Sequence, residues 1–256
     1  MRELYQQIDT LRDISLIRLG DENYLVIACD SAGGIGPKKG DSLRVPGQVV
    51  GRFTTRVALM EVMAVGARPV NVINTLAVEY EPTGKEIITG IRAEVNKAGL
   101  DPDIVINGST EENIPTFQTG IGVTVIGLVE ASGLRLARSS PLDMVVAVGL
   151  PMVGEEVLAK EELIADLSTL QGLLQLDFIH EILPVGSKGI SYEAGILAKM
   201  SGFKLDFNPE LKIDPEKSAG PGTVLLASLP ADKIEEVSRF ISKPVNMVGR
   251  LITKRE

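Results

Sequence analysis

Apolar and polar residues alternate along the chain in blocks that predict both strands and helices. Residues 24–29 (YLVIAC) form a short apolar run that ends at Asp30 and precedes several glycines, which predicts a buried strand that delivers an acid to a loop. Apolar residues at 57, 60, 64 and 65 have helical spacing and are followed by Gly66, so we expect a helix over residues 54–65. A further strand is expected within residues 68–79.

The next segment adds one predicted helix and two predicted strands. Thr83 and Glu86 have the spacing of a capping box, and isoleucine and valine positions between 87 and 95 then repeat at helical intervals. Residues 103–106 (DIVI) predict a buried strand that stops at the polar segment 107–113, and residues 120–130 predict a long strand.

After a connection at residues 136–143 the pattern of strands and helices starts again. Strands are predicted within 144–150, 223–230 and 244–251, and helical regions over about 154–174, after the loop 184–191, and at 234–241. We therefore expect an α/β (α+β) chain of two domains, residues 1–137 and 138–256, each of an ordinary domain size.

Composition and charge argue against nucleic acid and membranes as binding partners. Aromatic residues make up only 4% of the chain and Trp is absent, so stacking platforms for nucleic-acid bases are not expected. The net charge is −8, and the basic runs Lys38-Lys39 and Lys254-Arg255 are too short to predict binding to nucleic acid or anionic lipid. The N-terminus lacks the pattern of a signal peptide and no apolar stretch reaches the roughly 18 residues of a membrane span, so we expect a cytoplasmic protein.

The chain has one cysteine and one histidine, which limits its metal chemistry. Cys29 has no partner for an internal disulfide, and we expect it to be a small buried residue at a strand end. His180 alone does not provide a histidine metal site or a serine–histidine hydrolase. A metal in this protein would therefore have oxygen ligands, which favours Mg²⁺.

The segment CDSAGGIGPKKGD, residues 29–41, has the composition of a phosphate-binding loop. Its glycines let backbone N–H groups approach an anion, and its two lysines add positive charge. The segment matches neither GxxxxGK[ST] nor GxGxxG, so a tight turn between strands remains the alternative. The residues concerned are Gly33, Gly34, Gly36, Lys38 and Lys39.

Acidic and polar residues at the predicted strand ends are candidates for a cation site. Carboxylates that converge there would repel one another unless a divalent cation is bound, and the alternative is a set of separate solvated acids. The segment NGSTEEN adds neutral donors and acceptors suited to a hydrated Mg²⁺, with a polar turn as its alternative. The residues concerned are Asp30, Asp41, Glu61, Asn107, Ser109, Thr110, Glu111 and Glu112.

A second glycine loop precedes a predicted helix in the second half. In PVGSKGIS, residues 184–191, Gly186 and Gly189 bracket Ser187 and Lys188. The start of such a helix binds anions through its free N–H groups, although a simple turn has the same composition.

Five segments, in this order, resemble a known superfamily. They are ACDS (28–31), MEVMAVGARPV (60–70), INGSTEENIPTFQTGIGVTVIG (106–127), IHEILPVGSKGISYEAGILAKMSG (179–202) and GTVLLASLP with PVNMVGRL (222–230, 244–251). The set is similar to the superfamily that contains aminoimidazole ribonucleotide synthetase (PurM), thiamine-monophosphate kinase, selenophosphate synthetase and HypE, and it covers nearly the whole chain.

The resemblance implies a PurM-like fold of two α/β domains, with a homodimer in which the N-terminal domains build a shared β-barrel. It also implies ATP under a mobile glycine-rich loop, with Mg²⁺ held by carboxylates and a small-molecule acceptor in the cleft. The implied catalytic residues are Asp30 and Lys188, and the implied metal ligands are Asp30, Glu61, Glu111 and Glu112. The implied nucleotide-binding residues are Gly33, Gly34, Gly36, Lys38, Lys39, Arg56, Asn107, Ser109 and Thr110.

The sequence departs from the family pattern at four places. Glu61 and Ser109 stand where the family has aspartates, Lys188 occupies the C-terminal glycine-rich position, and GPG (220–222) replaces an acidic GED. These departures favour alpha-ribazole kinase, which phosphorylates the 5′-hydroxyl of alpha-ribazole for the cobamide lower loop. The alternatives are an enzyme resembling thiamine-monophosphate kinase and a non-catalytic nucleotide sensor. A HypE-like protein is disfavoured because the chain ends ITKRE, without a terminal cysteine.

Overall fold

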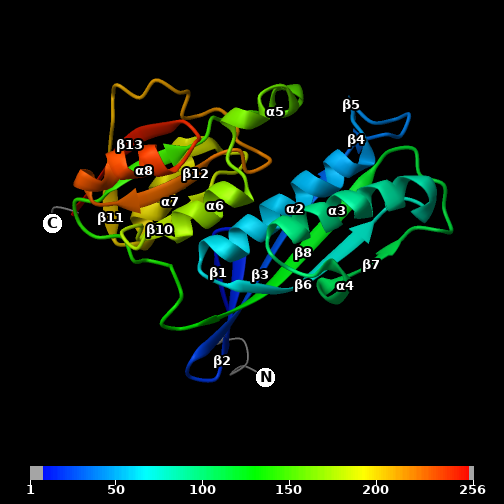
Figure 1. Cartoon of the computed structure of the whole chain (residues 1–256), viewed down its shortest axis with the longest axis horizontal. Helices are drawn as coiled ribbons and strands as arrows, with labels where there is room; N and C mark the ends of the chain where they lie inside the picture. The colour runs from blue at the N-terminus through cyan, green and yellow to red at the C-terminus, as the bar shows by residue number, and fades with distance from the viewer. Residues whose placement is uncertain (1–7, 254–256) are drawn as a thin grey trace. The chain divides into compact units, whose positions relative to one another are not determined.

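The computed structural model describes residues 8–253, which form two compact units (Figure 1). The first unit is made of the chain up to Met63 together with Ala67–Gly133, and the second of Ala64–Gly66 with the chain from Leu134 onward. Both units contain helices and a sheet, which confirms the α/β class.

The first unit is built on a six-stranded sheet. Its strands lie in the order β1-β2-β3-β8-β6-β7, and all neighbours are antiparallel except the parallel pair β6–β7. The elements are β1 (Ile8–Leu11), β2 (Ile14–Leu19), β3 (Asn23–Gly33), β4 (Ile35–Gly36), β5 (Leu43–Arg44), α2 (Gly47–Ala64), β6 (Arg68–Leu76), η1 (Tyr80–Gly84), α3 (Lys85–Lys97), α4 (Pro102–Val105), β7 (Ile106–Thr110) and β8 (Gly120–Glu130).

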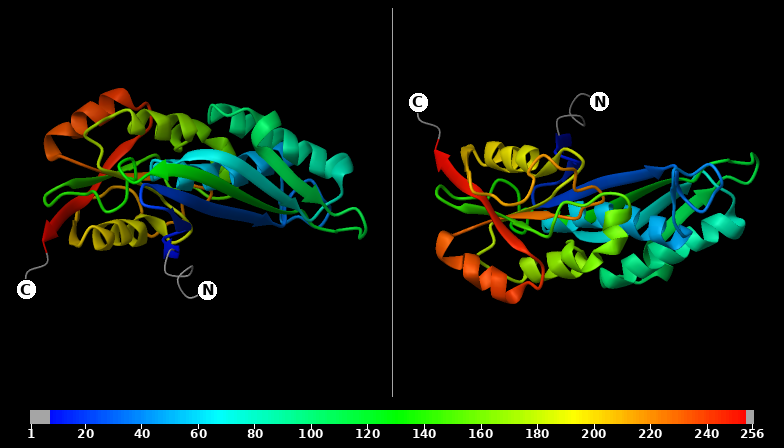
Figure 2. Two further views of the ribbon diagram at one scale, coloured as in Figure 1. Left: turned by 90° about the horizontal axis from the view of Figure 1, so that it is seen from below. Right: turned by 90° about the horizontal axis from the view of Figure 1, so that it is seen from above.

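Helices α2 and α3 lie on one face of this sheet, and within the described residues of this unit the other face carries no helix (Figure 2). A side chain added at Gly127 of β8 would meet Val62 of α2, which shows how closely the helix packs on the sheet. Val26, Val72 and Val125 point to the helix-covered face and are fully buried, as the two-residue period of a half-covered sheet requires.

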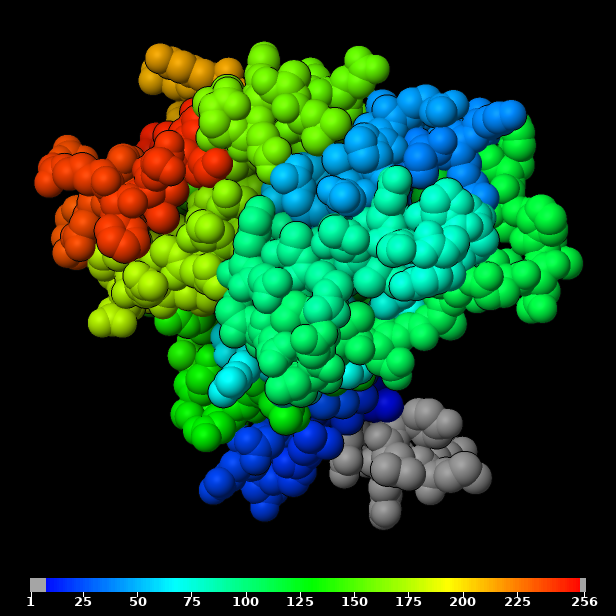
Figure 3. All heavy atoms as spheres, turned by 45° about the vertical axis from the view of Figure 1, so that its right-hand side comes forward, coloured from blue at the N-terminus to red at the C-terminus, as the bar shows by residue number. Residues whose placement is uncertain are grey.

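Two glycines let α2 and α3 approach each other closely. A Cβ at Gly51 would lie 2.1 Å from the carbonyl oxygen of Ile87, and a Cβ at Gly90 would lie 2.1 Å from that of Gln48. Figure 3 shows α2 and α3 side by side on the surface of this unit. Both positions therefore need glycine for the close contact rather than for an unusual backbone angle.

Three local sequence predictions in this unit are wrong. The strand expected to end at Asp30 continues to Gly33, because Cys29–Gly33 pair with residues 120–124 of β8. Residues 103–105 are helical, since Asp101 accepts a hydrogen bond from the Asp103 amide at 2.9 Å and Pro102 opens the turn. The capping box is absent: α3 begins at Lys85 with no side-chain cap, and the Glu86 carboxylate instead accepts from the Gly47 amide of α2 at 3.1 Å.

The second unit is a five-stranded antiparallel sheet in the order β10-β12-β9-β13-β11. Helix α7 covers one face and helices α6 and α8 the other (Figure 2). The elements are β9 (Met144–Val148), α5 (Glu155–Ala159), η2 (Glu161–Leu163), α6 (Leu167–Leu174), β10 (Glu181–Pro184), α7 (Gly189–Met200), β11 (Phe203–Phe207), β12 (Leu225–Leu229), η3 (Ala231–Lys233), α8 (Ile234–Phe240) and β13 (Val245–Thr253).

The strands expected within 144–150, 223–230 and 244–251 are confirmed as β9, β12 and β13. Both faces of β9 and β12 are covered, so their sequences are continuous apolar runs rather than alternating ones. Within residues 8–253, no helix has the length and apolar character that crossing a membrane requires.

Candidate functional site

Acidic and basic residues meet where strand β2 begins beside strand β3. Arg12 and Asp13 form the two-residue turn between β1 and β2, in which Leu11 pairs with Ile14. Ile14 in turn pairs with Ala28, and β3 continues past that point to Asp30. Asp30 follows the buried residues Val26 and Ala28 at two-residue intervals, so its side chain lies on the face that the helices cover.

The partial burial of Asp30 raises its pKa from 3.8 to about 6. Removal of the carboxylate from water is the main cause; a hydrogen bond from the Ser31 backbone lowers the pKa, and the negative charge of Asp13 raises it. The negative charge of Asp13 thus acts on the Asp30 carboxyl, and a cation close to Asp30 would favour its ionised form.

Glu61, which the sequence suggested as a metal ligand, is buried on α2 with a residue exposure of 5%. Its carboxylate forms an ion pair with the guanidinium of Arg12, at 3.5 Å from Oε2 to Nη2. The Arg12 side chain is itself only 3% exposed. The negative charge of Glu61 is thus paired with the positive charge of Arg12.

The four predicted metal ligands do not form a single cluster. Among residues 8–253, no group of three or more His, Cys, Asp and Glu side chains has the arrangement of a metal site. Asp30 carries carboxylate oxygens of the kind Mg²⁺ prefers and is the predicted ligand that would hold a cation here, with Asp13 as the acid whose charge acts on it.

Asp13 and Arg12 were missed by the sequence analysis. Ile14 and Leu16 are buried and alternate with less buried residues, which is the signal of a strand in the N-terminal segment. A strand prediction there would have placed the turn residues Arg12 and Asp13 beside the strand that carries Asp30.

The glycine-rich segment is a tight, hydrogen-bonded structure. The amides of Gly34 and Gly40 donate to the carbonyls of Thr119 and Phe117, at 2.9 Å and 3.1 Å. Asp41 accepts hydrogen bonds from the Lys38 amide and from the amide and hydroxyl of Thr119, at 2.7–2.8 Å. Gly36 has φ +150°, and a Cβ there would meet the Thr119 hydroxyl, so glycine is required at this position.

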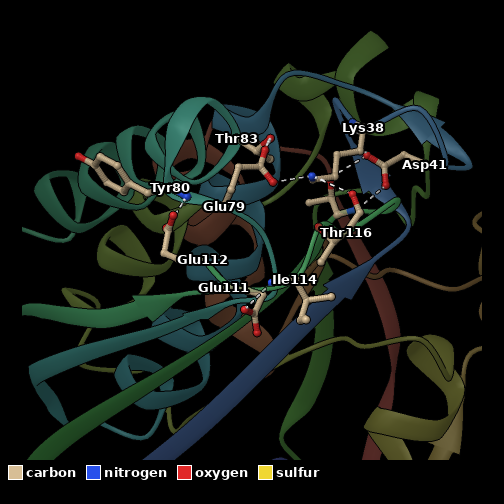
Figure 4. A network of polar contacts seen from close by, with 10 residues as sticks. Lys38, Asp41, Glu79, Tyr80, Thr83, Glu111, Glu112, Ile114 and Thr116 are labelled. Atoms are coloured by element: carbon tan, nitrogen blue, oxygen red, sulfur yellow. Dashed lines mark hydrogen bonds and ion pairs between the residues drawn. The ribbon is translucent and has the colours of Figure 1, made fainter.

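Lys38 is held by an ion pair and a carbonyl (Figure 4). Its Nζ donates to Glu79 Oε2 at 2.5 Å and to the Thr116 carbonyl at 3.0 Å. Desolvation raises the pKa of Glu79, but the hydrogen bonds from Lys38 and Thr83 outweigh this and lower the pKa below its ordinary value. Lys39 is exposed, so it is the more accessible of the two lysines for a ligand anion.

Glu111 and Glu112 stabilise the turn after β7 (Figure 4). Glu111 Oε1 accepts hydrogen bonds from the amides of Asn113 and Ile114, at 2.7 Å and 3.1 Å. Glu112 Oε1 accepts from the Tyr80 amide at 2.8 Å and from the Thr110 hydroxyl at 2.7 Å. Both carboxylates thus have a local role in the structure as it stands.

A hollow of about 560 Å³ brings several predicted residues together at one end of the six-stranded sheet. Hydroxyl groups and glycines dominate its lining, which leaves room for a polar ligand close to the backbone. Gly33, Ser109, Thr110 and Glu111 were predicted from the sequence; the other lining residues are Ser31, Ala32, Thr75, Leu76, Ala77, Gly120, Ile121 and Gly122.

Three other predicted residues make contacts of their own. Arg56 is 1% exposed, pairs with Glu94 at 2.6 Å from Nε to Oε1 and lies over the Phe53 ring, so it is not accessible to a phosphate. The Asn107 side chain accepts from the Gly108 amide at 2.8 Å. Lys188, in the second unit, is exposed at the start of α7 and donates to the Tyr192 hydroxyl at 3.1 Å.

The comparisons with known proteins concern the first unit and the fold of the whole chain. Residues 11–129 match the family described as AIR synthase related protein, N-terminal domain. No curated protein sequence matches the chain.

Solved structures match over nearly the full length. A chain of the HypE–HypF complex has a TM-score of 0.66 at 17% identity, covering 93% of this chain and 87% of that chain. Thiamine-monophosphate kinase from Stenotrophomonas maltophilia K279a has a TM-score of 0.64 at 18% identity, covering 99% and 92%. AaThiL complexed with AMPPCP and TMP has a TM-score of 0.63 at 14% identity, covering 95% and 85%. The chain therefore has the PurM-like fold, and its residues 11–129 match the AIR synthase-related N-terminal domain.

Proposed function

We propose that the protein is an ATP- and Mg²⁺-dependent kinase that transfers the γ-phosphate to a hydroxyl group of a small molecule. The observation that carries this proposal is the match of residues 11–129 to the AIR synthase-related N-terminal domain, in which the partly buried acid Asp30 lies. The likeness to AaThiL complexed with AMPPCP and TMP supports a nucleotide as the ligand.

In this proposal Asp30 holds Mg²⁺, which would neutralise charge on the transferring phosphoryl group. Lys39 is exposed and adds positive charge to the glycine-rich segment, while Lys38 positions that segment through Glu79. Ser31, Thr75 and Ser109 line the hollow on the helix-free face of the sheet, which is the opposite face from Asp30, so we do not assign their hydroxyls to the metal site. Lys188 is proposed to bind the acceptor.

The acceptor we propose is alpha-ribazole, with alpha-ribazole 5′-phosphate as the product. The basis is the set of departures from the family pattern, above all Ser109 and the Gly220–Gly222 segment in place of acids. Thiamine monophosphate is the alternative acceptor, and the likeness to thiamine-monophosphate kinase supports it.

The protein is also proposed to form a homodimer through the helix-free face of the six-stranded sheet. Ile17, Leu25 and Leu128 lie in one row across β2, β3 and β8, and Ile27 pairs with Ile126 in a row nearby. Leu128 is 42% exposed in the single chain. Such an apolar face is typical of a surface that another chain covers.

A second candidate function is nucleotide sensing without phosphoryl transfer. The pairing of Glu61 with Arg12 favours it, because this pairing occupies one of the acids that a metal-dependent kinase would otherwise use.

Product analysis distinguishes the candidates. Purified protein is incubated with Mg-ATP and alpha-ribazole, thiamine monophosphate, aminoimidazole precursors or no acceptor, and ADP and phosphorylated product are measured by mass spectrometry. Equal amounts of ADP and alpha-ribazole phosphate are expected. ATP binding without turnover on any acceptor would indicate the sensor, and the absence of ATP binding would contradict both candidates.

A further inference from the structure

We propose that the second unit has a binding site for an elongated apolar carboxylate in the hollow between helix α7 and strand β11, with Lys199 as the cation that receives the carboxylate. The hollow has a volume of about 490 Å³. The inference is independent of the proposed kinase activity, to which no residue of this hollow is assigned. The lining residues are Ser191, Gly195, Ala198, Lys199, Phe203, Lys204, Leu205 and Phe207.

Strand β11 provides the apolar wall of the hollow. It is an edge strand of the five-stranded sheet, and among the described residues it pairs only with β13. Phe203, Leu205 and Phe207 alternate along β11, so their side chains share one face of the strand. They pack against the buried cluster that includes residues of α7, but each is only partly buried. The edge of the sheet therefore leaves apolar surface uncovered beside α7.

Helix α7 provides a second wall, which is made of small side chains. Ser191, Gly195 and Ala198 recur at helical spacing and lie on one face of α7. Glycine inside a helix is destabilising relative to alanine. Gly195 has no positive φ, and a Cβ there would meet nothing within 4 Å, so neither the backbone nor a close contact requires glycine. Its missing side chain instead leaves the hollow open.

Polar groups lie at the two ends of the helix wall. Within residues 8–253, neither the Ser191 hydroxyl nor the Lys199 ammonium has a hydrogen-bond or ion-pair partner. From 191 to 199 helix α7 rises by roughly 12 Å, at 1.5 Å per residue. Lys204 alternates with the apolar residues of β11, so its side chain leaves the other face of the strand and we do not assign the anion to it.

The walls and the end groups together select the chemistry of the ligand. A hollow of this size with apolar and aromatic walls and a few placed polar groups is typical of small-molecule sites, which measure roughly 300–1,000 Å³. At one end, the Lys199 ammonium can donate charge-assisted hydrogen bonds to a carboxylate. An apolar body would cover the exposed surface of Phe203 and Leu205. The fitting ligand is therefore an unbranched carboxylate with an apolar chain about 12 Å long.

Calorimetric titration with decanoate, an unbranched carboxylate of about this length, tests the inference, and 1-decanol is the uncharged comparison. The wild type is expected to bind decanoate more tightly than 1-decanol. Lys199→Met removes the charge and keeps an apolar side chain, so it should weaken decanoate binding at least about tenfold and leave 1-decanol binding within about twofold. Gly195→Leu fills the hollow and should weaken the binding of both molecules at least about tenfold.

Lys160→Met and Ser238→Leu are the matched controls, since both residues are exposed in the same unit and lie outside the hollow. Both variants should bind decanoate like the wild type. Circular dichroism establishes that each variant is folded, and Gly195→Met, with the same expected effect, replaces Gly195→Leu if the latter does not fold.

Three results would overturn the inference. They are the absence of decanoate binding by the wild type, decanoate binding that Gly195→Leu does not weaken, and equal weakening of decanoate and 1-decanol binding by Lys199→Met. A Gly195→Leu variant that binds decanoate like the wild type but sediments differently would assign this groove to a protein contact instead. None of these results bears on the product analysis with Mg-ATP, which tests the proposed kinase separately.

Discussion

Asp30 links the chemistry of the candidate site to the stability of the fold. The pKa of Asp30 is about 6 in the folded protein, compared with its ordinary value of 3.8 in an unfolded chain. At pH values between 3.8 and 6 the folded state therefore binds more protons than the unfolded state. The free energy of unfolding therefore falls as pH rises from about 4 to 6. The stabilisation from protonated Asp30 is complete below pH 3.8 and is lost above pH 6.

Asp30→Asn should remove this pH dependence, because asparagine does not ionise. In metal-free buffer the variant is expected to gain stability over the wild type between pH 4 and 7, with an upper bound of about 3 kcal/mol from two pKa units. Urea unfolding of the wild type and the variant at pH 4 and at pH 7 measures this difference in the free energy of unfolding. An equal change of stability with pH in both proteins would contradict the prediction.

Lys38 and Lys39 are adjacent but should respond differently to substitution. Lys38→Met removes the ion pair with Glu79 and the bond to the Thr116 carbonyl, and is expected to lower the free energy of unfolding by about 1–2 kcal/mol. Lys39→Met should leave stability within about 0.5 kcal/mol, because its side chain is exposed. It should weaken ATP binding about tenfold if the proposed nucleotide site is correct.

Thermal unfolding and ATP titration calorimetry on both lysine variants separate the two roles. A Lys39→Met variant that binds ATP like the wild type would remove Lys39 from the proposed site.

Cys29 and Arg56 show what a sequence pattern leaves open at the residue scale. Cys29 was expected to be buried and is exposed, because β3 continues and its odd-numbered positions face the side without helices. Arg56 was expected to bind phosphate, and it lies inside α2 against Glu94 of α3. The face of a helix or strand on which a residue lies depends on packing partners that are distant in sequence. The type of a single residue, such as a cysteine or an arginine, does not reveal those partners.

The contact between α2 and α3 makes a prediction at the scale of elements. Gly51→Ala and Gly90→Ala each place a methyl group 2.1 Å from a carbonyl oxygen of the other helix, so the helices must separate. Each is expected to lower the free energy of unfolding by about 1–3 kcal/mol, despite the higher helix propensity of alanine. Urea unfolding monitored by circular dichroism measures the loss.

Gly195→Ala is the matched control for these variants. Gly195 is also inside a helix, α7, but a Cβ there meets nothing within 4 Å. This change should stabilise the protein by up to about 1 kcal/mol. Stabilisation by Gly51→Ala to the same extent would show that the close helix contact is not maintained in solution.

The sequence predicted most elements correctly where apolar runs were long, and failed where a local signal had two meanings. Residues 103–106 are apolar enough for a strand, yet Asp101 and Pro102 form a helix start that the apolar pattern concealed. Thr83 and Glu86 have capping-box spacing, yet Thr83 donates to Glu79 at 2.5 Å instead. Spacing alone does not decide between a local cap and a bond to another element.

At the scale of the whole molecule, the ordered motifs predicted the PurM-like fold, and this prediction is confirmed. The site was predicted only in part. Asp30 and Glu61 were identified from their motif positions, whereas Arg12 and Asp13 join them only through the pairing of β2 with β3. The position of Arg12 and Asp13 beside Asp30 depends on how β2 pairs with β3. The sequence analysis predicted no strand in the N-terminal segment, so this pairing could not be predicted.

The proposed dimer gives a prediction for the whole molecule. Leu128→Arg places a charge in the apolar row formed with Leu25 and Ile17 on the helix-free face of the sheet. If this face is covered by a second copy, burial of the unpaired arginine should weaken self-association by at least about 100-fold. Sedimentation velocity over a range of protein concentrations measures the change.

Phe240→Arg provides the comparison, since Phe240 is an apolar residue on α8 of the second unit with 53% exposure. It should leave the sedimentation coefficient unchanged, which would show that loss of the dimer in Leu128→Arg comes from the sheet face and not from added charge. A Leu128→Arg protein that sediments as the wild-type dimer would place the interface elsewhere. A wild-type protein that sediments as a monomer at all concentrations would contradict the homodimer itself, and the apolar rows would then require another partner to cover them.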